Sequence, residues 1–272
     1  MVSNWVSNHG VSRFSKTLTG VRVFSLIALG SASMLLAQNP SNGMVAANRE
    51  VTPPRADLSH EMRGDILMAR KMFREAIEVY QTGPKDSAVI ANKTGIAFHQ
   101  MQDLDNAKKC YERAAKLKPE YAEAVNNLGT IYYAHKSYRR AVNQYKKALR
   151  LTPESASIHS NLGTAYFGRR DYEKAFEEYQ EALKLDPEVF EHKSSHGVML
   201  QERAVDERAK FHFYLAKTYA KAGQVDRALM YVRKAIEEGF KEREKFAKDP
   251  EFALLRDLPE FKILMTTEYK VI

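Results

Sequence analysis

Two neighbouring segments of the chain carry nearly the same pattern of residues. Residues 126–153 read NNLGTIYYAHKSYRRAVNQYKKALRLTP, and residues 160–187 read SNLGTAYFGRRDYEKAFEEYQEALKLDP, 34 residues later. Small and aromatic residues recur in step, whereas the charged residues between them change freely. A fixed period of this length is typical of structural units that stack on one another. The sequence therefore predicts a repeat array.

A third copy of the pattern precedes these two at the same spacing. In the middle copy the recurring residues are Leu128, Gly129, Tyr132, Ala141, Tyr145, Ala148 and Pro153. The following copy has Leu162, Gly163, Tyr166, Ala175, Tyr179, Ala182 and Pro187, and the preceding copy has Thr94, Gly95, Phe98, Ala107, Tyr111, Ala114 and Pro119.

Each copy predicts a helical hairpin, because the recurring residues have helical spacing in two runs separated by a break. Gly129 and Ala141 allow the two helix backbones to approach closely, while Tyr132 and Tyr145 fill the space beside that contact. The proline near the end of each copy stops the second helix, because the residue before a proline is pushed out of helical geometry.

Weaker copies flank the three regular ones, and the chain divides accordingly. The expected repeats cover about 57–87, 88–121, 122–155, 156–189 and 209–241. Between the last two, residues 190–208 are an insertion, whose apolar residues Val198, Met199 and Leu200 are expected either beside the binding groove or buried in a longer helix. Residues 242–272 are expected to cap the apolar end of the array, with Asp249 as N-cap and Pro250 at the first helical position.

The recurring residues resemble the tetratricopeptide repeat. The departures from the family pattern are Thr94 in place of leucine, and Ala91, Val125 and His159 where tryptophan is frequent. The resemblance implies an all-α fold, a right-handed superhelical solenoid of antiparallel helix pairs. It also implies a role in protein–protein interaction, in which the first helix of each pair lines a concave groove that binds a peptide or a partner helix.

Carried over position by position, the resemblance implies a polar groove with an aromatic strip. The residues expected to face a partner are Asn92, His99, Asn127, Thr130, Tyr133, Asn161, Thr164, Phe167, Phe213 and Lys217, together with Ile96 and Ala220. Asn127 and Asn161 resemble the asparagines by which some superhelical members hold a peptide backbone, and the alternative is that these amides bond within the hairpin. A carboxylate clamp is not expected, because Ile96 and Tyr214 replace the polar or basic residues it needs.

No motif for catalysis or for a cofactor is found in the sequence, which indicates a protein that is not an enzyme and needs no cofactor. His192 and His196 are four residues apart and suit one helical face as metal ligands, but two histidines alone favour solvated side chains. Cys110, the only cysteine, is interpreted as a small helix residue beside the core.

The N-terminus has the order of residues that is typical of a secretory signal peptide. Three basic residues and no acidic one precede or flank the apolar run VFSLIALGSASMLLA, which ends at Ala37. At 15 residues this run is shorter than the about 20 needed to span a membrane, so an uncleaved anchor is the weaker interpretation. Residues 1–37 are therefore predicted to be a signal peptide and 38–56 a flexible lead-in, which places the protein in the periplasm or cell envelope.

An alternative function comes from charge. The chain has a formal net charge of +8, and six basic residues lie between Lys136 and Arg150. They favour binding of an anionic envelope polymer or nucleic acid through this helix face, although a solvated outer face also explains them. Export makes nucleic acid a poor target, so the expected partner is a protein or peptide.

Overall fold

The computed structural model describes residues 58–191 and 205–267, with the side chains of residues 205 and 206 excepted. Within these ranges the chain is helical and contains no strand. The predicted signal peptide, the lead-in up to Ala56, His192, His196 and the apolar residues 198–200 lie outside the described residues. No helix among those described is both long enough and apolar enough to cross a membrane.

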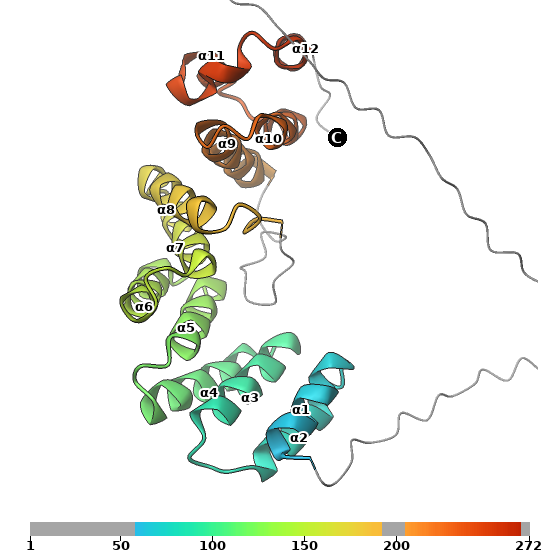
Figure 1. The fold of residues 1–272 in the computed structure, drawn as a ribbon, viewed down its shortest axis with the longest axis vertical. Helices are drawn as coiled ribbons and strands as arrows, with labels where there is room; N and C mark the ends of the chain where they lie inside the picture. Colours follow the sequence, from blue (N-terminus) through green and yellow to red (C-terminus); the bar gives the residue numbers. More distant parts are fainter. Residues whose placement is uncertain (1–57, 192–204, 268–272) are drawn as a thin grey trace, which may run out of the picture. The chain divides into compact units, whose positions relative to one another are not determined.

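The helices follow one another in five pairs (Figure 1). The first helix of each pair packs on the second, and the second packs on the first helix of the next pair. The pairs are α1 (His60–Ala69) with α2 (Phe73–Thr82), α3 (Ala88–Gln100) with α4 (Leu104–Leu117), α5 (Ala122–Ala134) with α6 (Tyr138–Leu151), α7 (Ala156–Gly168) with α8 (Tyr172–Leu185), and α9 (Val205–Lys221) with α10 (Val225–Glu237).

This arrangement confirms the predicted all-α array of helix pairs. The second helices α4, α6 and α8 end two residues before Pro119, Pro153 and Pro187, as the prolines predicted. The first helix of the last pair is longer than those of the three preceding pairs, since α9 has 17 residues whereas α3, α5 and α7 have 13 each.

A glycine and a tyrosine fix the distance between the two helices of each of the first four pairs. A Cβ atom added to Gly64, Gly95, Gly129 or Gly163 would lie 2.1–2.7 Å from the ring of the tyrosine sixteen residues later. Real Cβ atoms do not come this close, so only glycine accommodates these rings. The partner tyrosines are Tyr80, Tyr111, Tyr145 and Tyr179, each at most 1% exposed.

The fifth pair solves the same packing problem with different residues. Ala216 and Val232 occupy the positions of the glycine and the tyrosine, and both are fully buried. The larger residue on the first helix is thus matched by a smaller one on the second, which keeps the packing close without a glycine.

Every turn between the two helices of a pair contains one residue with positive φ. These residues are Lys71, Gln102, Lys136, Arg170 and Gly223, with φ between 55° and 72°. Only the fifth turn uses glycine, which adopts this conformation without steric cost. The other four turns therefore hold strained backbone.

The C-terminal segment packs on the last pair. It consists of α11 (Glu244–Lys248), the 3-10 helix η1 (Pro250–Leu255) and α12 (Pro259–Thr266). η1 contacts α9 and α10, and α12 contacts α10. Pro250 opens η1 as predicted, but the carboxylate of Asp249 does not cap it and instead pairs with Lys217.

Candidate functional site

The candidate site is the face formed by the first helices α3, α5, α7 and α9, on which the sequence places the groove residues. Counting from the glycine that faces the tyrosine, or from Ala216 in the fifth pair, puts equivalent residues in columns along these helices. In such columns Asn127 and Asn161 are equivalent, and so are His99, Tyr133 and Phe167.

The same count corrects the expected position of two residues. The equivalent of Asn127 in the second pair is Lys93, not Asn92, and in the fifth pair it is Tyr214, not Phe213. Asn92 and Phe213 lie one position earlier, in the column of Asn126. Lys93 is thus a residue of this face that the sequence analysis missed, although a strict step of 34 residues back from Asn127 finds it.

Hydrogen bonds join these two columns across three successive interfaces between pairs. Lys93 donates to Oε1 of Glu61 at 2.7 Å, Asn127 Nδ2 to Oδ1 of Asn92 at 3.0 Å, and Asn161 Nδ2 to Oδ1 of Asn126 at 3.0 Å. Each donor lies in the later pair and each acceptor in the earlier one. We call these six residues the polar ladder.

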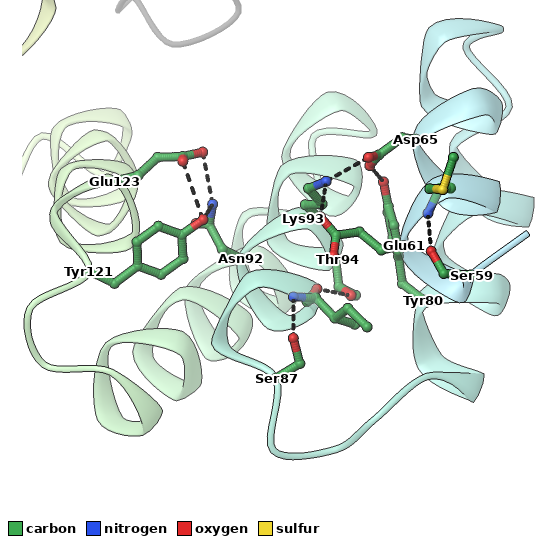
Figure 2. Close-up of polar contacts among 12 residues, drawn as sticks. Ser59, Glu61, Asp65, Tyr80, Ser87, Asn92, Lys93, Thr94, Tyr121 and Glu123 are labelled. Atoms are coloured by element: carbon green, nitrogen blue, oxygen red, sulfur yellow. Dashed lines mark hydrogen bonds and ion pairs between the residues drawn. The ribbon is translucent and has the colours of Figure 1, made fainter.

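Charged and aromatic side chains complete the first steps of the polar ladder, as Figure 2 shows. Lys93 also donates to Oδ2 of Asp65 at 2.6 Å, and Asp65 accepts a hydrogen bond from the hydroxyl of Tyr80. Burial alone would lower the pKa of Lys93. The hydrogen bonds to Asp65 and Glu61 outweigh burial and raise this pKa, so the ammonium group is stabilised.

At the next step, Asn92 connects the second and third pairs. Its Nδ2 donates to Oε1 of Glu123 at 2.9 Å and lies 3.4 Å from the hydroxyl of Tyr121 (Figure 2). Burial, together with the charge of Glu123, raises the pKa of Tyr121 to about 12. The phenol of Tyr121 therefore keeps its proton at neutral pH.

The asparagines of the expected groove are engaged inside the array. Asn92, Asn127 and Asn161 are 0%, 4% and 2% exposed. Their amides bond between helix pairs, an arrangement that differs from the bonding within one hairpin considered from the sequence. Buried amides of this kind must find partners, and the polar ladder supplies them.

Thr130 and Thr164 are buried as well, and each accepts a bond from the tyrosine that faces the neighbouring glycine. The hydroxyl of Tyr145 donates to Oγ1 of Thr130 at 3.2 Å, and that of Tyr179 to Oγ1 of Thr164 at 3.3 Å. These threonines therefore support the contact between the two helices of their own pairs.

Aromatic contacts replace the polar ladder between the fourth and fifth pairs. The ring of Tyr214 stacks on Tyr172 at a centroid distance of 5.3 Å, and Phe167 lies edge-on to Tyr172, Phe211 and Tyr214. Phe167 is 3% exposed. A cavity of about 310 Å³ adjoins these rings, lined by Phe167, Arg170, Tyr172, Glu207, Lys210, Gly239, Phe240, Lys241 and Glu242.

The C-terminal segment contacts the expected groove residues of α9. Phe213 lies against the rings of Phe240, Phe246 and Phe252. The ammonium group of Lys217 lies 3.3 Å from a carboxylate oxygen of Asp249 and 3.5 Å from one of Glu251, and its side chain is 12% exposed.

Besides Lys217, two residues of the expected set keep a half-buried position on the first helices. They are His99 on α3 and Tyr133 on α5, equivalent residues in successive pairs, and Ile96 is half-buried beside His99. Burial lowers the pKa of His99, which keeps its imidazole neutral at pH 7. Aromatic and apolar side chains are thus partly exposed at these positions of α3 and α5, and the ring of Tyr133 also contacts Tyr138 of α6 at a centroid distance of 5.4 Å.

The described residues contain no group of three or more His, Cys, Asp or Glu side chains placed to hold a metal ion. Cys110 is half-buried on α4, and burial raises the pKa of its thiol. A protonated, partly covered thiol is a poor nucleophile.

Comparisons with known proteins agree with the repeat pattern. Family models of the TPR repeat match residues 95–136 and 129–169, and a tetratricopeptide repeat model matches 156–189. No curated protein matches the sequence.

Among solved structures, MamA from Desulfovibrio magneticus RS-1 is 21% identical and covers 70% of this chain and 95% of its own, with a TM-score of 0.47. The first TPR of Spaghetti (RPAP3) bound to an HSP90 peptide is 23% identical over 40% of this chain and 86% of its own, with a TM-score of 0.38. The family models, which rest on sequence, identify residues 95–189 as tetratricopeptide repeats.

Proposed function

We propose that the protein is an exported, non-enzymatic scaffold that binds a protein or peptide partner through the first helices of its array. Tetratricopeptide repeats are typical of interaction scaffolds, and the matched repeats support this general role. Repeat arrays bind along an extended surface because each pair contributes equivalent positions to it.

The observation that carries the proposal is the polar ladder. Bonds between successive pairs hold α1, α3, α5 and α7 against one another. A surface that is already ordered loses less conformational entropy when a partner binds. The amides themselves are buried, so the partner contacts the residues beside them.

The contact residues we propose are His99 and Tyr133, together with Ile96, which precedes His99 by three residues on α3. Aromatic side chains dominate the energy of many protein interfaces because they bury a large area at low entropic cost. The neutral imidazole of His99 suits an apolar partner surface better than an imidazolium would. An apolar or aromatic side chain of an extended peptide fits this pair of residues.

A paired set of variants tests this surface. His99→Ala with Tyr133→Ala is expected to abolish capture of the partner from the envelope fraction, measured by quantitative pull-down with the full chain as bait. The control Glu173→Ala with Glu177→Ala changes exposed residues of the second helix α8 and is expected to leave capture unchanged. Equal capture by both variants, with unchanged folding by circular dichroism, would place the binding surface elsewhere.

Export is the second part of the proposal and rests on the order of residues in the first 37 positions. Intact-mass measurement of protein from its native host is expected to show a chain that begins at Gln38, or at Asn48 if cleavage instead follows Ala47, the second candidate. A full-length soluble product would contradict export through a cleaved signal.

A further inference from the structure

The outer surface of α6 differs from that of every other second helix in its charge. Its exposed residues are Arg139, Arg140, Asn143, Lys146, Lys147 and Arg150, and the helix contains no acidic residue. The equivalent positions on α8 hold Glu173, Lys174, Glu177, Gln180, Glu181 and Lys184, where acidic and basic residues alternate. The positive charge is therefore concentrated on one helix.

These cations have no carboxylate partner among the residues that the structure describes. The neighbouring second helices show the opposite behaviour, since Lys108 pairs with Glu112 on α4 and Lys184 pairs with Glu181 on α8. A row of unneutralised charges on one rigid helix repels itself, so it lowers stability unless an anion binds there.

Cations from α6 and from its neighbouring helices lie near the rings of two tyrosines, Tyr132 and Tyr166. Lys108 of α4 and Arg140 of α6 lie 5.7 and 5.8 Å from the ring centre of Tyr132. Lys146 of α6 and Lys174 of α8 both lie 5.7 Å from the ring centre of Tyr166. The negative face of a ring attracts cations and offsets their mutual repulsion.

The cations around the rings and those on α6 together make up a set that we call the basic strip, in which Lys108 is also paired with Glu112 and Lys174 with Asp171. It consists of Lys108, Arg139, Arg140, Lys146, Lys147, Arg150, Arg169 and Lys174, contributed by α4, α6, α8 and the turn after α7. Arg169 belongs to the set because it lies 5.9 Å from the centre of the Tyr166 ring.

We propose that the basic strip is a second binding surface, separate from the first-helix face, and that it binds a linear phosphate polymer. Three of the five cations on α6 are arginines, whose planar guanidinium groups bind phosphate oxygens in bidentate fashion. Successive charges along a helix are separated by about 5–6 Å, which suits an extended chain of anions laid along it.

The surroundings of the strip favour a polymer over a folded protein partner. Protein interfaces are built on apolar and aromatic anchors and are poor in lysine, whereas the exposed residues of α6 are all basic or amide. Tyr166 is only 4% exposed, and Tyr132 is half-buried with two cations within 6 Å of its ring centre, so these rings are poor platforms for stacking of a nucleic-acid base. The basic strip is therefore suited to a ligand that is recognised mainly through its negative charge.

Titration of the full chain with inorganic polyphosphate, followed by calorimetry at several salt concentrations, tests the proposal. The affinity is expected to fall by about 100-fold between 50 and 200 mM salt, as release of counterions from about five phosphate contacts requires. The triple variant Arg139→Gln, Lys147→Gln, Arg150→Gln is expected to bind at least about tenfold more weakly at 50 mM salt and to show a shallower salt dependence.

A control variant with the same loss of charge separates the strip from the net charge of the chain. Arg74→Gln, Lys248→Gln, Lys262→Gln changes three exposed cations outside the strip and is expected to weaken binding less than about threefold. Equal losses in both triple variants, an absence of binding, or tighter binding of poly-glutamate than of polyphosphate would each overturn the proposal. Melting curves confirm that both variants are folded.

Discussion

Gly129 and Tyr145 define the distance between α5 and α6, because a Cβ atom on Gly129 would lie 2.7 Å from Cε1 of the Tyr145 ring. The tyrosine ring takes the space that a side chain on Gly129 would need. In the fifth pair the larger residue stands on the first helix, since the equivalent positions hold Ala216 and Val232, both fully buried.

Gly129→Ala is therefore expected to destabilise the array by about 1–3 kcal/mol through overpacking, as measured by urea unfolding. Tyr145→Val alone is expected to cost about 3 kcal/mol through the cavity it leaves. The double variant Gly129→Ala with Tyr145→Val has the residues of the fifth pair at these positions. Its loss of stability should be smaller than the sum of the losses in the two single variants, and strict additivity would contradict this account of the packing.

Lys136 is expected to limit stability, because its φ of 55° places a lysine in the left-handed region. Lys136→Gly removes strain of about 1–2 kcal/mol from the folded state. Glycine also increases the conformational entropy of the unfolded chain, which offsets part of this gain. The expected net gain in the free energy of unfolding is about 0.5–1 kcal/mol. Gly223→Lys, at the equivalent turn of the fifth pair, should lower stability, and a gain there would refute the argument.

Asn127→Asp tests the polar ladder. The change replaces the amide that donates to Asn92 by a buried carboxylate that faces an oxygen atom. Unfolding at pH 7 is expected to become easier by roughly 3 kcal/mol or more, because the buried carboxylate would face the oxygen of Asn92 and have only the long, 3.4 Å bond from Asn126 Nδ2 to offset its charge. The same change at exposed Asn143 should stay within about 0.5 kcal/mol, and an equally small effect at Asn127 would mean that the ladder contributes little.

The lowered pKa of His99 predicts how the stability of the fold depends on pH. Burial lowers its pKa below the ordinary value of 6.5, so the unfolded chain binds the proton more readily than the folded one. Its contribution to stability is complete above pH 6.5 and is lost as the pH falls below that value. Burial lowers the pKa of His212 too, against the effect of Glu238, and adds to the same trend.

His99→Gln removes that titration and is expected to flatten the decline in melting temperature between pH 7 and pH 5 relative to the unmodified chain. A decline of the same size in this variant would mean that other groups control the acid sensitivity.

The helix pairs could be predicted from the sequence because each copy of the repeat can be compared with the others. Gly129, Tyr145 and Pro153 recur at fixed distances, and each has a local physical reason for its position. Pro250 predicted the start of η1 in the same way, but η1 is a 3-10 helix and the carboxylate of Asp249 does not cap it.

The candidate site was harder to predict, since the residues that a partner can reach depend on how successive pairs cover one another. Asn92 was placed in the wrong column because Asn126 and Asn127 are adjacent and both polar, so the pattern alone left a shift of one residue open. The burial of Phe167 depends on Tyr172, Phe211 and Tyr214, which come from two other helices. No period in the sequence reveals that contact.

The proposed role of the first helices is tested most directly by site-specific crosslinking. A photoreactive amino acid is placed at Tyr133 on α5 in one variant and at Asn143 on α6 in another, and each is expressed in the native host and irradiated. The account predicts a discrete crosslinked product from position 133 and none of that size from position 143. A product from position 143 alone would contradict binding through the first helices.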